Sequence, residues 1–164
     1  MAPQAVLGVG VLFSFLAWGT VSATYIWPAL RNVPRPLAVR ALLSLHAFRF
    51  VGLAFIVPGV VSPELPLAFA RPDAYGDLGA ALLALLTLWV LPKTGWIPLA
   101  WIANLWGVLD LLNAIYEGNR NGLEAGQLGA TFFIITVAVP LLLITHGLMI
   151  ALLLRRDPGA QLAS

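Results

Sequence analysis

The chain has 164 residues, of which 60% are hydrophobic and only 10% are charged, and its net charge is +2. Soluble domains carry about 25% charged residues, so this composition excludes an ordinary soluble domain and indicates a protein that folds in lipid. At about 20 apolar residues per crossing, the chain has room for about five spans with short loops. The sequence therefore predicts an all-α, polytopic transmembrane bundle, a single domain over residues 1–164, located in the inner membrane of the cell.

The charged and sulfur-containing residues exclude several other classes of protein. Nine basic and seven acidic residues leave little excess positive charge for binding nucleic acid. There is no cysteine, which excludes disulfides, cysteine-ligated iron–sulfur clusters, covalently attached haem and thiol catalysis. The lipid bilayer is the partner that the composition itself predicts.

Five apolar stretches, separated by prolines and polar residues, predict the five spans. In chain order they cover residues 5–30, 37–60, 78–91, 95–116 and 131–154. Asp77 is predicted to be the N-cap of the third span. That span is short, because about 14 residues rise only about 21 Å in a hydrocarbon core about 30 Å thick. The positions of the basic residues decide whether it crosses.

The basic residues favour five crossings. With five spans, six of them fall on one side and two on the other, counting Arg31, Arg35, Arg40, Lys93, Arg155 and Arg156 against Arg71 and Arg120. The positive-inside rule then places the C-terminus in the cytoplasm and the N-terminus outside. Residues 62–77 and 117–127 become loops on the outer side.

Only two histidines are present, and both lie inside predicted spans. His46 is about 13 Å from the cytoplasmic start of the second span, and His146 is about 12 Å from the cytoplasmic end of the fifth. Two imidazoles at one depth are what the iron of a b-type haem requires. They are therefore predicted to be the metal ligands of haem b in an electron-transfer module that serves a quinone. The alternative is two structural histidines that hydrogen-bond neighbouring helices.

Arg49 and Asp110 form a second candidate group, at about 18 Å and 22 Å from the inner edge. Opposite charges at similar depth in a bilayer are expected to pair, because an unpaired ion there is costly. Asp110→Asn should then leave a buried guanidinium without a counter-ion. The pair is either a fixed link between helices or a proton or anion site. If haem is bound, Arg49 could contact a haem propionate instead.

The fourth span adds further polar residues to this group. Asp110, Asn113 and Glu117 follow one another at i, i+3 and i+7, so they share a helix face. Lipid would reject such a face, which predicts a buried polar stripe turned into the bundle. This pattern supports the alternative function, a transport or proton-relay protein that uses the Arg49–Asp110 pair.

A third class is a non-catalytic accessory subunit of a membrane complex. A chain made of spans, without a soluble domain or a nucleotide-binding motif, seldom performs a reaction alone. We therefore expect a homo-oligomer or a subunit of a larger membrane complex rather than an enzyme acting on its own.

Overall fold

The computed structural model describes residues 1–91, 93 and 95–155, and its regular elements there are all helices. Within this part of the chain, five helices are long and apolar enough to cross a membrane, as the sequence predicted. They are Pro3–Arg31, Arg35–Ile56, Leu67–Val90, Trp96–Arg120 and Gly129–Leu154. Arg156, which was counted among the basic residues above, lies outside the described residues.

Three of the five spans change their helix type along their length. The first contains α1 (Pro3–Val21), the π-helical segment η1 (Ser22–Ile26) and α2 (Trp27–Arg31); the second contains α3 (Arg35–His46) and the 3₁₀ helix η2 (Ala47–Ile56); the last contains the 3₁₀ turn η4 (Gly129–Thr131), the π-helical segment η5 (Ile134–Ala138) and α6 (Val139–Leu154). Each π-helical segment ends two residues before a proline, Pro28 or Pro140. Proline cannot donate the usual backbone bond, so the hydrogen-bond ladder shifts just ahead of it.

The third span, α4 (Leu67–Val90), is longer than the sequence predicted. Its 24 residues rise about 36 Å, which is enough to cross. It begins 11 residues before the predicted start at residue 78, so Asp77 lies inside the helix and is buried instead of capping it. The prediction failed because Pro72, Asp73 and Asp77 are residue types that are typical of loops. Pro72, however, stands near the helix start, where it disturbs few bonds.

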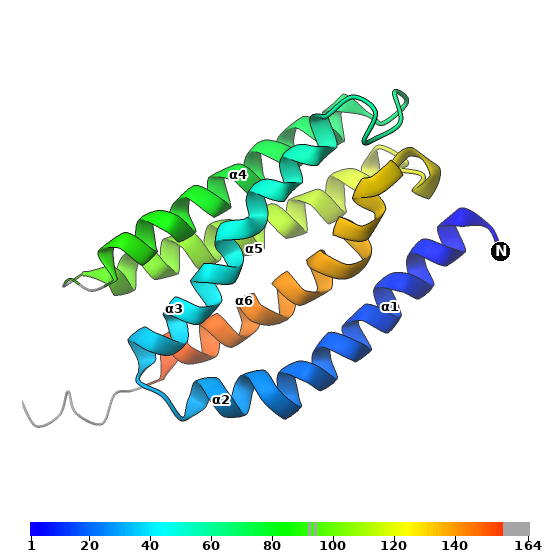
Figure 1. Cartoon of the computed structure of the whole chain (residues 1–164). Coiled ribbons are helices and arrows are strands. Elements are labelled where there is room, and N and C mark those ends of the chain that lie inside the picture. Colours follow the sequence, from blue (N-terminus) through cyan, green and yellow to red (C-terminus); the bar gives the residue numbers. More distant parts are fainter. Residues whose placement is uncertain (92, 94, 156–164) are drawn as a thin grey trace, which may run out of the picture.

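The fourth span is α5 (Trp96–Arg120), and a 3₁₀ turn, η3 (Ala125–Gln127), precedes the last span. The second to fifth spans pack around one another, with α4 contacting η2, α3 and α5, and α6 contacting α3 and α5. α1 packs against α6 and η5, on the side of α6 away from α4 and α5 (Figure 1). No residue of α1 is fully buried, so this helix covers the bundle from outside, with Leu7 packed against one of its apolar clusters.

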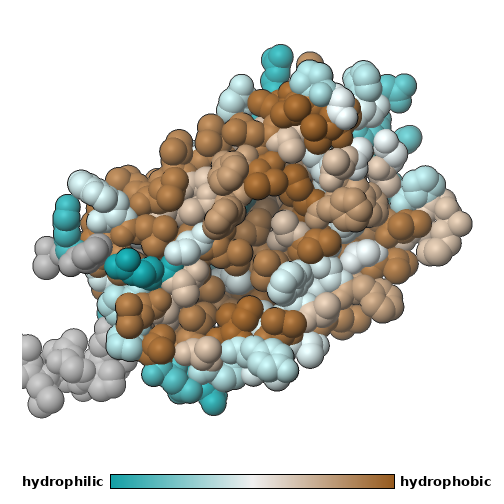
Figure 2. Space-filling model, in the orientation of Figure 1, coloured by the Kyte–Doolittle hydropathy of each residue, from teal (hydrophilic) through white to brown (hydrophobic). Residues whose placement is uncertain are grey.

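The interior consists of two apolar clusters with polar residues between them. One cluster includes Leu43, Ala84 and Met149, and the other includes Phe55 and Ala74. Along the second span, the buried polar residues His46 and Arg49 lie between Leu43 of the first cluster and Phe55 of the second. On the exterior face in Figure 2 the middle is mostly hydrophobic and the strongly hydrophilic residues gather toward the ends, as expected for a bundle surrounded by lipid.

Candidate functional site

The 3₁₀ helix η2 aligns the residues that begin the buried polar site. A 3₁₀ helix has about three residues per turn, so residues three apart lie directly above one another. His46, Arg49, Gly52 and Phe55 follow this spacing, and all four are buried. In an α-helix the same residues would rotate progressively away from one face. The 3₁₀ geometry keeps the Arg49 side chain pointed at α4 and α5.

Arg49 is the centre of the site and is only 3% exposed. Its Nε donates to Asp77 Oδ1 at 2.7 Å, and its Nη2 donates to Asp110 Oδ2 at 2.5 Å. Its Nη1 donates to the backbone carbonyl of Gly107 at 3.1 Å. The structure thus brings together Arg49 and Asp110, as the matching depths suggested, and adds a second carboxylate from α4.

Three glycines allow the helices to approach these charges closely. A Cβ atom at Gly52 would overlap the carboxylate of Asp77, and one at Gly76 would overlap that of Asp110. A Cβ at Gly107 would overlap both the Arg49 guanidinium and the ring of a histidine on α6. η2, α4 and α5 therefore each present backbone, at one glycine, to a polar group of the site.

His146 extends the site toward the end of the bundle where α3 begins and α6 ends. Its Nδ1 lies 2.8 Å from Asn104 Oδ1, and its Nε2 lies 3.4 Å from Arg49 Nη1. The guanidinium can only donate, and the amide oxygen can only accept. These partners fix the neutral ring with its proton on Nδ1 and its lone pair directed at Arg49.

His46 has the opposite tautomer. Thr145 Oγ1 donates to the carbonyls of Leu141 and Leu142 at 2.9 and 3.0 Å, and it lies 3.3 Å from His46 Nε2. Because the single hydroxyl proton is used on the carbonyls, Nε2 of His46 donates to Thr145 and Nδ1 carries the lone pair. Among the described residues, neither His46 Nδ1 nor Asn104 Nδ2 has a hydrogen-bond partner.

A small cavity lies beside these two atoms. Its volume is about 10 Å³, and His46, Arg49, Asn104, His146 and Met149 are among the residues that line it. This is about the smallest volume that holds one water molecule. A water there could donate to Nδ1 of His46 and accept from Nδ2 of Asn104, which would satisfy both buried atoms.

The two imidazole rings lie at one level, as the sequence predicted, and they stack directly on each other. Their centroids are 4.0 Å apart and their planes are inclined by 26°. Haem b held by His46 and His146 needs the iron and the porphyrin plane between the rings, so it would require α3 and α6 to move apart. In the described part of the chain, no group of three or more His, Asp or Glu side chains is placed to hold a metal ion. Haem ligation, with Arg49 at a propionate, stays a prediction.

The predicted polar stripe on the fourth span does not continue beyond Asp110. Asn113 is exposed, and Glu117 bonds with Arg120 and Asn121 at the end of α5. The prediction that Asn113 and Glu117 are buried in the site was wrong. Three residues turn an α-helix by about 300°, so Asn113 lies about 60° further from the buried face than Asp110, which is at its edge.

A family model matches residues 6–154, which leaves out only the first five and the last ten residues. The chain belongs to the family described as "Domain of unknown function (DUF8737)". No curated protein and no solved structure matches the chain. All residues of the buried site lie within the range that this DUF8737 model covers.

Sequence reasoning missed three site residues of this DUF8737 member. Asp73 and Asp77 were assigned to an outer loop, and Asn104 was not considered, yet all three are buried. The available signal for the aspartates was their i, i+4 spacing, which places both on one face of a helix if the third span begins earlier. For Asn104 the signal was its amide, a polar group that lipid disfavours, in the middle of the fourth span.

Proposed function

We propose that this chain is a multi-pass protein of the inner membrane that relays protons, with Arg49, Asp77 and Asp110 as its proton-binding group. The observation that carries the proposal is the charge imbalance at this group, in which the buried carboxylate of Asp77 and the partly buried one of Asp110 share one guanidinium. Asp73, 8% exposed and one helical turn from Asp77, adds a third acidic group nearby.

Charge neutrality explains why this group would bind protons. A net charge inside the bundle is costly, because little water is present to solvate it. One proton neutralises the set of Arg49, Asp77 and Asp110, and a second neutralises the set that includes Asp73. Buried acidic and histidine side chains of this kind are the usual components of proton relays in membrane proteins.

The histidines supply the next part of the relay. Imidazole accepts a proton at one nitrogen and releases it from the other. Arg49 donates a hydrogen bond to Nε2 of His146 without giving up its proton, so it positions this ring, on which His46 stacks at a centroid distance of 4.0 Å. A water in the adjoining cavity of about 10 Å³ would deliver a proton to Nδ1 of His46, which carries the lone pair, and Nε2 of His46 would release one on the side of Thr145; Asn104 would only orient this water.

The orientation of the proposed relay in the membrane follows from the basic residues, which we propose lie on the cytoplasmic side. Asp73 would then lie toward the outer side, and His46 toward the cytoplasm. A single cysteine at Asn121 should react with an impermeant reagent from outside the cell, and one at Arg31 should not. The proposal also includes assembly into a homo-oligomer or a larger membrane complex, because the described chain is almost entirely spans.

Proton flux into proteoliposomes tests the proposal. Purified protein is reconstituted in liposomes that contain a pH-sensitive dye, and a potassium diffusion potential drives protons inward. We expect the wild-type protein to acidify the interior faster than protein-free liposomes. Asp77→Asn and Asp110→Asn should remove most of this flux, because each eliminates a carboxyl group of the proton-binding group.

Glu117→Gln is the matched control, because it neutralises a carboxylate on the same helix as Asp110 but outside the site. Its flux should equal that of the wild type. Wild-type flux no greater than in protein-free liposomes, or equal flux in all variants, would refute the proposed relay.

A further inference from the structure

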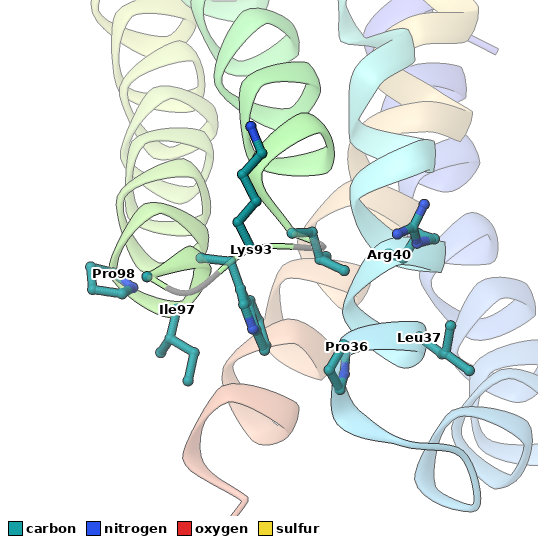
Figure 3. Close-up of a pocket in the computed structure, with 9 residues that line it drawn as sticks. Pro36, Leu37, Arg40, Lys93, Ile97 and Pro98 are labelled. Atoms are coloured by element: carbon teal, nitrogen blue, oxygen red, sulfur yellow. The ribbon is translucent and has the colours of Figure 1, made fainter.

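A pocket of about 630 Å³ lies at the end of the bundle where α3 begins and α4 ends. Arg40 on α3 and Lys93 after α4 are both part of its lining (Figure 3). The remaining lining is largely apolar and includes Leu37, Trp96 and Ile97. Its volume is within the range of small-molecule sites, about 300–1,000 Å³.

The two cations at this pocket have no acidic partner within the described residues. Neither Arg40 nor Lys93 takes part in the salt bridges of the described residues, which join Arg49 to Asp77 and Asp110 and Arg120 to Glu117. Lys93 Nζ lies 3.8 Å from the ring centroid of Trp89, a contact that holds the ammonium in place while leaving its charge uncompensated. Arg40 is exposed.

The acidic residues of the described chain lie away from this pocket. Six acidic residues are described, and all lie elsewhere: Asp73, Asp77 and Asp110 in the middle of the bundle, and Glu64, Glu117 and Glu124 toward the opposite end. Among the described residues, no acidic side chain therefore supplies a counter-charge for Arg40 and Lys93, and the pocket offers both cations to an anionic ligand.

We infer that this pocket binds the phosphate headgroup of an anionic phospholipid. The two cations lie near the helix ends, which is the depth of lipid headgroups. Trp96 lines the pocket and Trp89 contacts Lys93, and tryptophan is enriched at that depth in membrane proteins. The apolar lining suits the upper part of an acyl chain. Basic pockets between helices on the cytoplasmic side of a membrane bind anionic headgroups in this way. The inference does not depend on proton transfer.

Lipid binding to the purified, delipidated protein tests this inference by native mass spectrometry. The probes are a phosphatidylglycerol, a phosphatidylcholine with the same acyl chains, and inorganic phosphate. The wild-type protein should bind phosphatidylglycerol in preference to phosphatidylcholine. The double variant Arg40→Gln/Lys93→Gln should bind phosphatidylglycerol about 30-fold more weakly, because both cations of the pocket lining are lost.

The matched control is Arg71→Gln/Arg120→Gln, which removes the same charge near the other end of the bundle and should retain wild-type affinity. Circular dichroism verifies that both double variants remain helical. Equal losses in the two double variants would overturn the inference, because they would reflect overall charge and not a site. Competition by inorganic phosphate as effective as that by phosphatidylglycerol would also overturn it, since the pocket would then bind a free anion.

Discussion

Replacing Arg49 with glutamine would remove the only cation that contacts the buried carboxylates of Asp77 and Asp110 in the described chain. The side chains are 1% exposed for Arg49, 9% for Asp77 and 10% for Asp110. Removing one partner of a buried ion pair costs about 3–5 kcal/mol, because the remaining charge stays buried without a counter-ion. Arg49→Gln should lower the free energy of unfolding by about this amount.

Replacing either carboxylate should lower the free energy of unfolding less than replacing Arg49 does. After Asp77→Asn, Asp110 still neutralises Arg49, and after Asp110→Asn, Asp77 does so. Each single change then removes a charge-assisted hydrogen bond, which contributes about 1.5–3 kcal/mol. The sequence-based expectation that Asp110→Asn leaves the guanidinium without a counter-ion is therefore wrong, because it did not include Asp77. Only the double variant Asp77→Asn/Asp110→Asn should match the loss caused by Arg49→Gln.

Unfolding in mixed detergent micelles, followed by the fluorescence of the six tryptophans, measures these free energies. Arg71→Gln is the control, because Arg71 is exposed on the same bundle, and it should stay within about 0.5 kcal/mol of the wild type. The reasoning fails if Arg49→Gln costs no more than Asp77→Asn, since the guanidinium would then not be the counter-charge of the cluster.

Three further predictions concern packing and burial. Gly107→Ala should lower the free energy of unfolding by about 1–3 kcal/mol through overpacking, whereas Gly19→Ala, with open space around its Cβ, should not destabilise the protein; equal effects would contradict the close approach at Gly107. A single cysteine at position 73, in place of Asp73, should not react with a water-soluble maleimide in folded protein, while one in place of the exposed Glu64 should react. Rapid reaction at both positions would mean that residue 73 lies in an exposed loop. Asn104→Leu should lower the free energy of unfolding by about 1–3 kcal/mol, because Nδ1 of His146 loses its hydrogen-bond acceptor. An unchanged nitrogen NMR signal of the His146 ring would contradict this hydrogen bond.

The number of spans and the depths of the buried polar residues were determined by the sequence alone. Hydropathy is a local property, and five apolar stretches predict five spans wherever the chain lies in lipid. Depth follows from counting residues at a fixed helical rise. For this reason residue counting alone is enough to place His46 and His146 at one level, and Arg49 near Asp110.

Only the tertiary structure decided where the third span begins and which side chains meet at the site. Asp77 resembles a loop residue by itself, and it lies inside α4 because Arg49 of a different helix neutralises it. Asn113 and Asp110 differ by about 60° around α5, and the packing of α5 against α4 and α6 decides which of them is buried. The depth of a residue can be counted from the sequence of its own helix. Which way its side chain faces in the bundle, and which side chain it contacts, depend on the neighbouring helices.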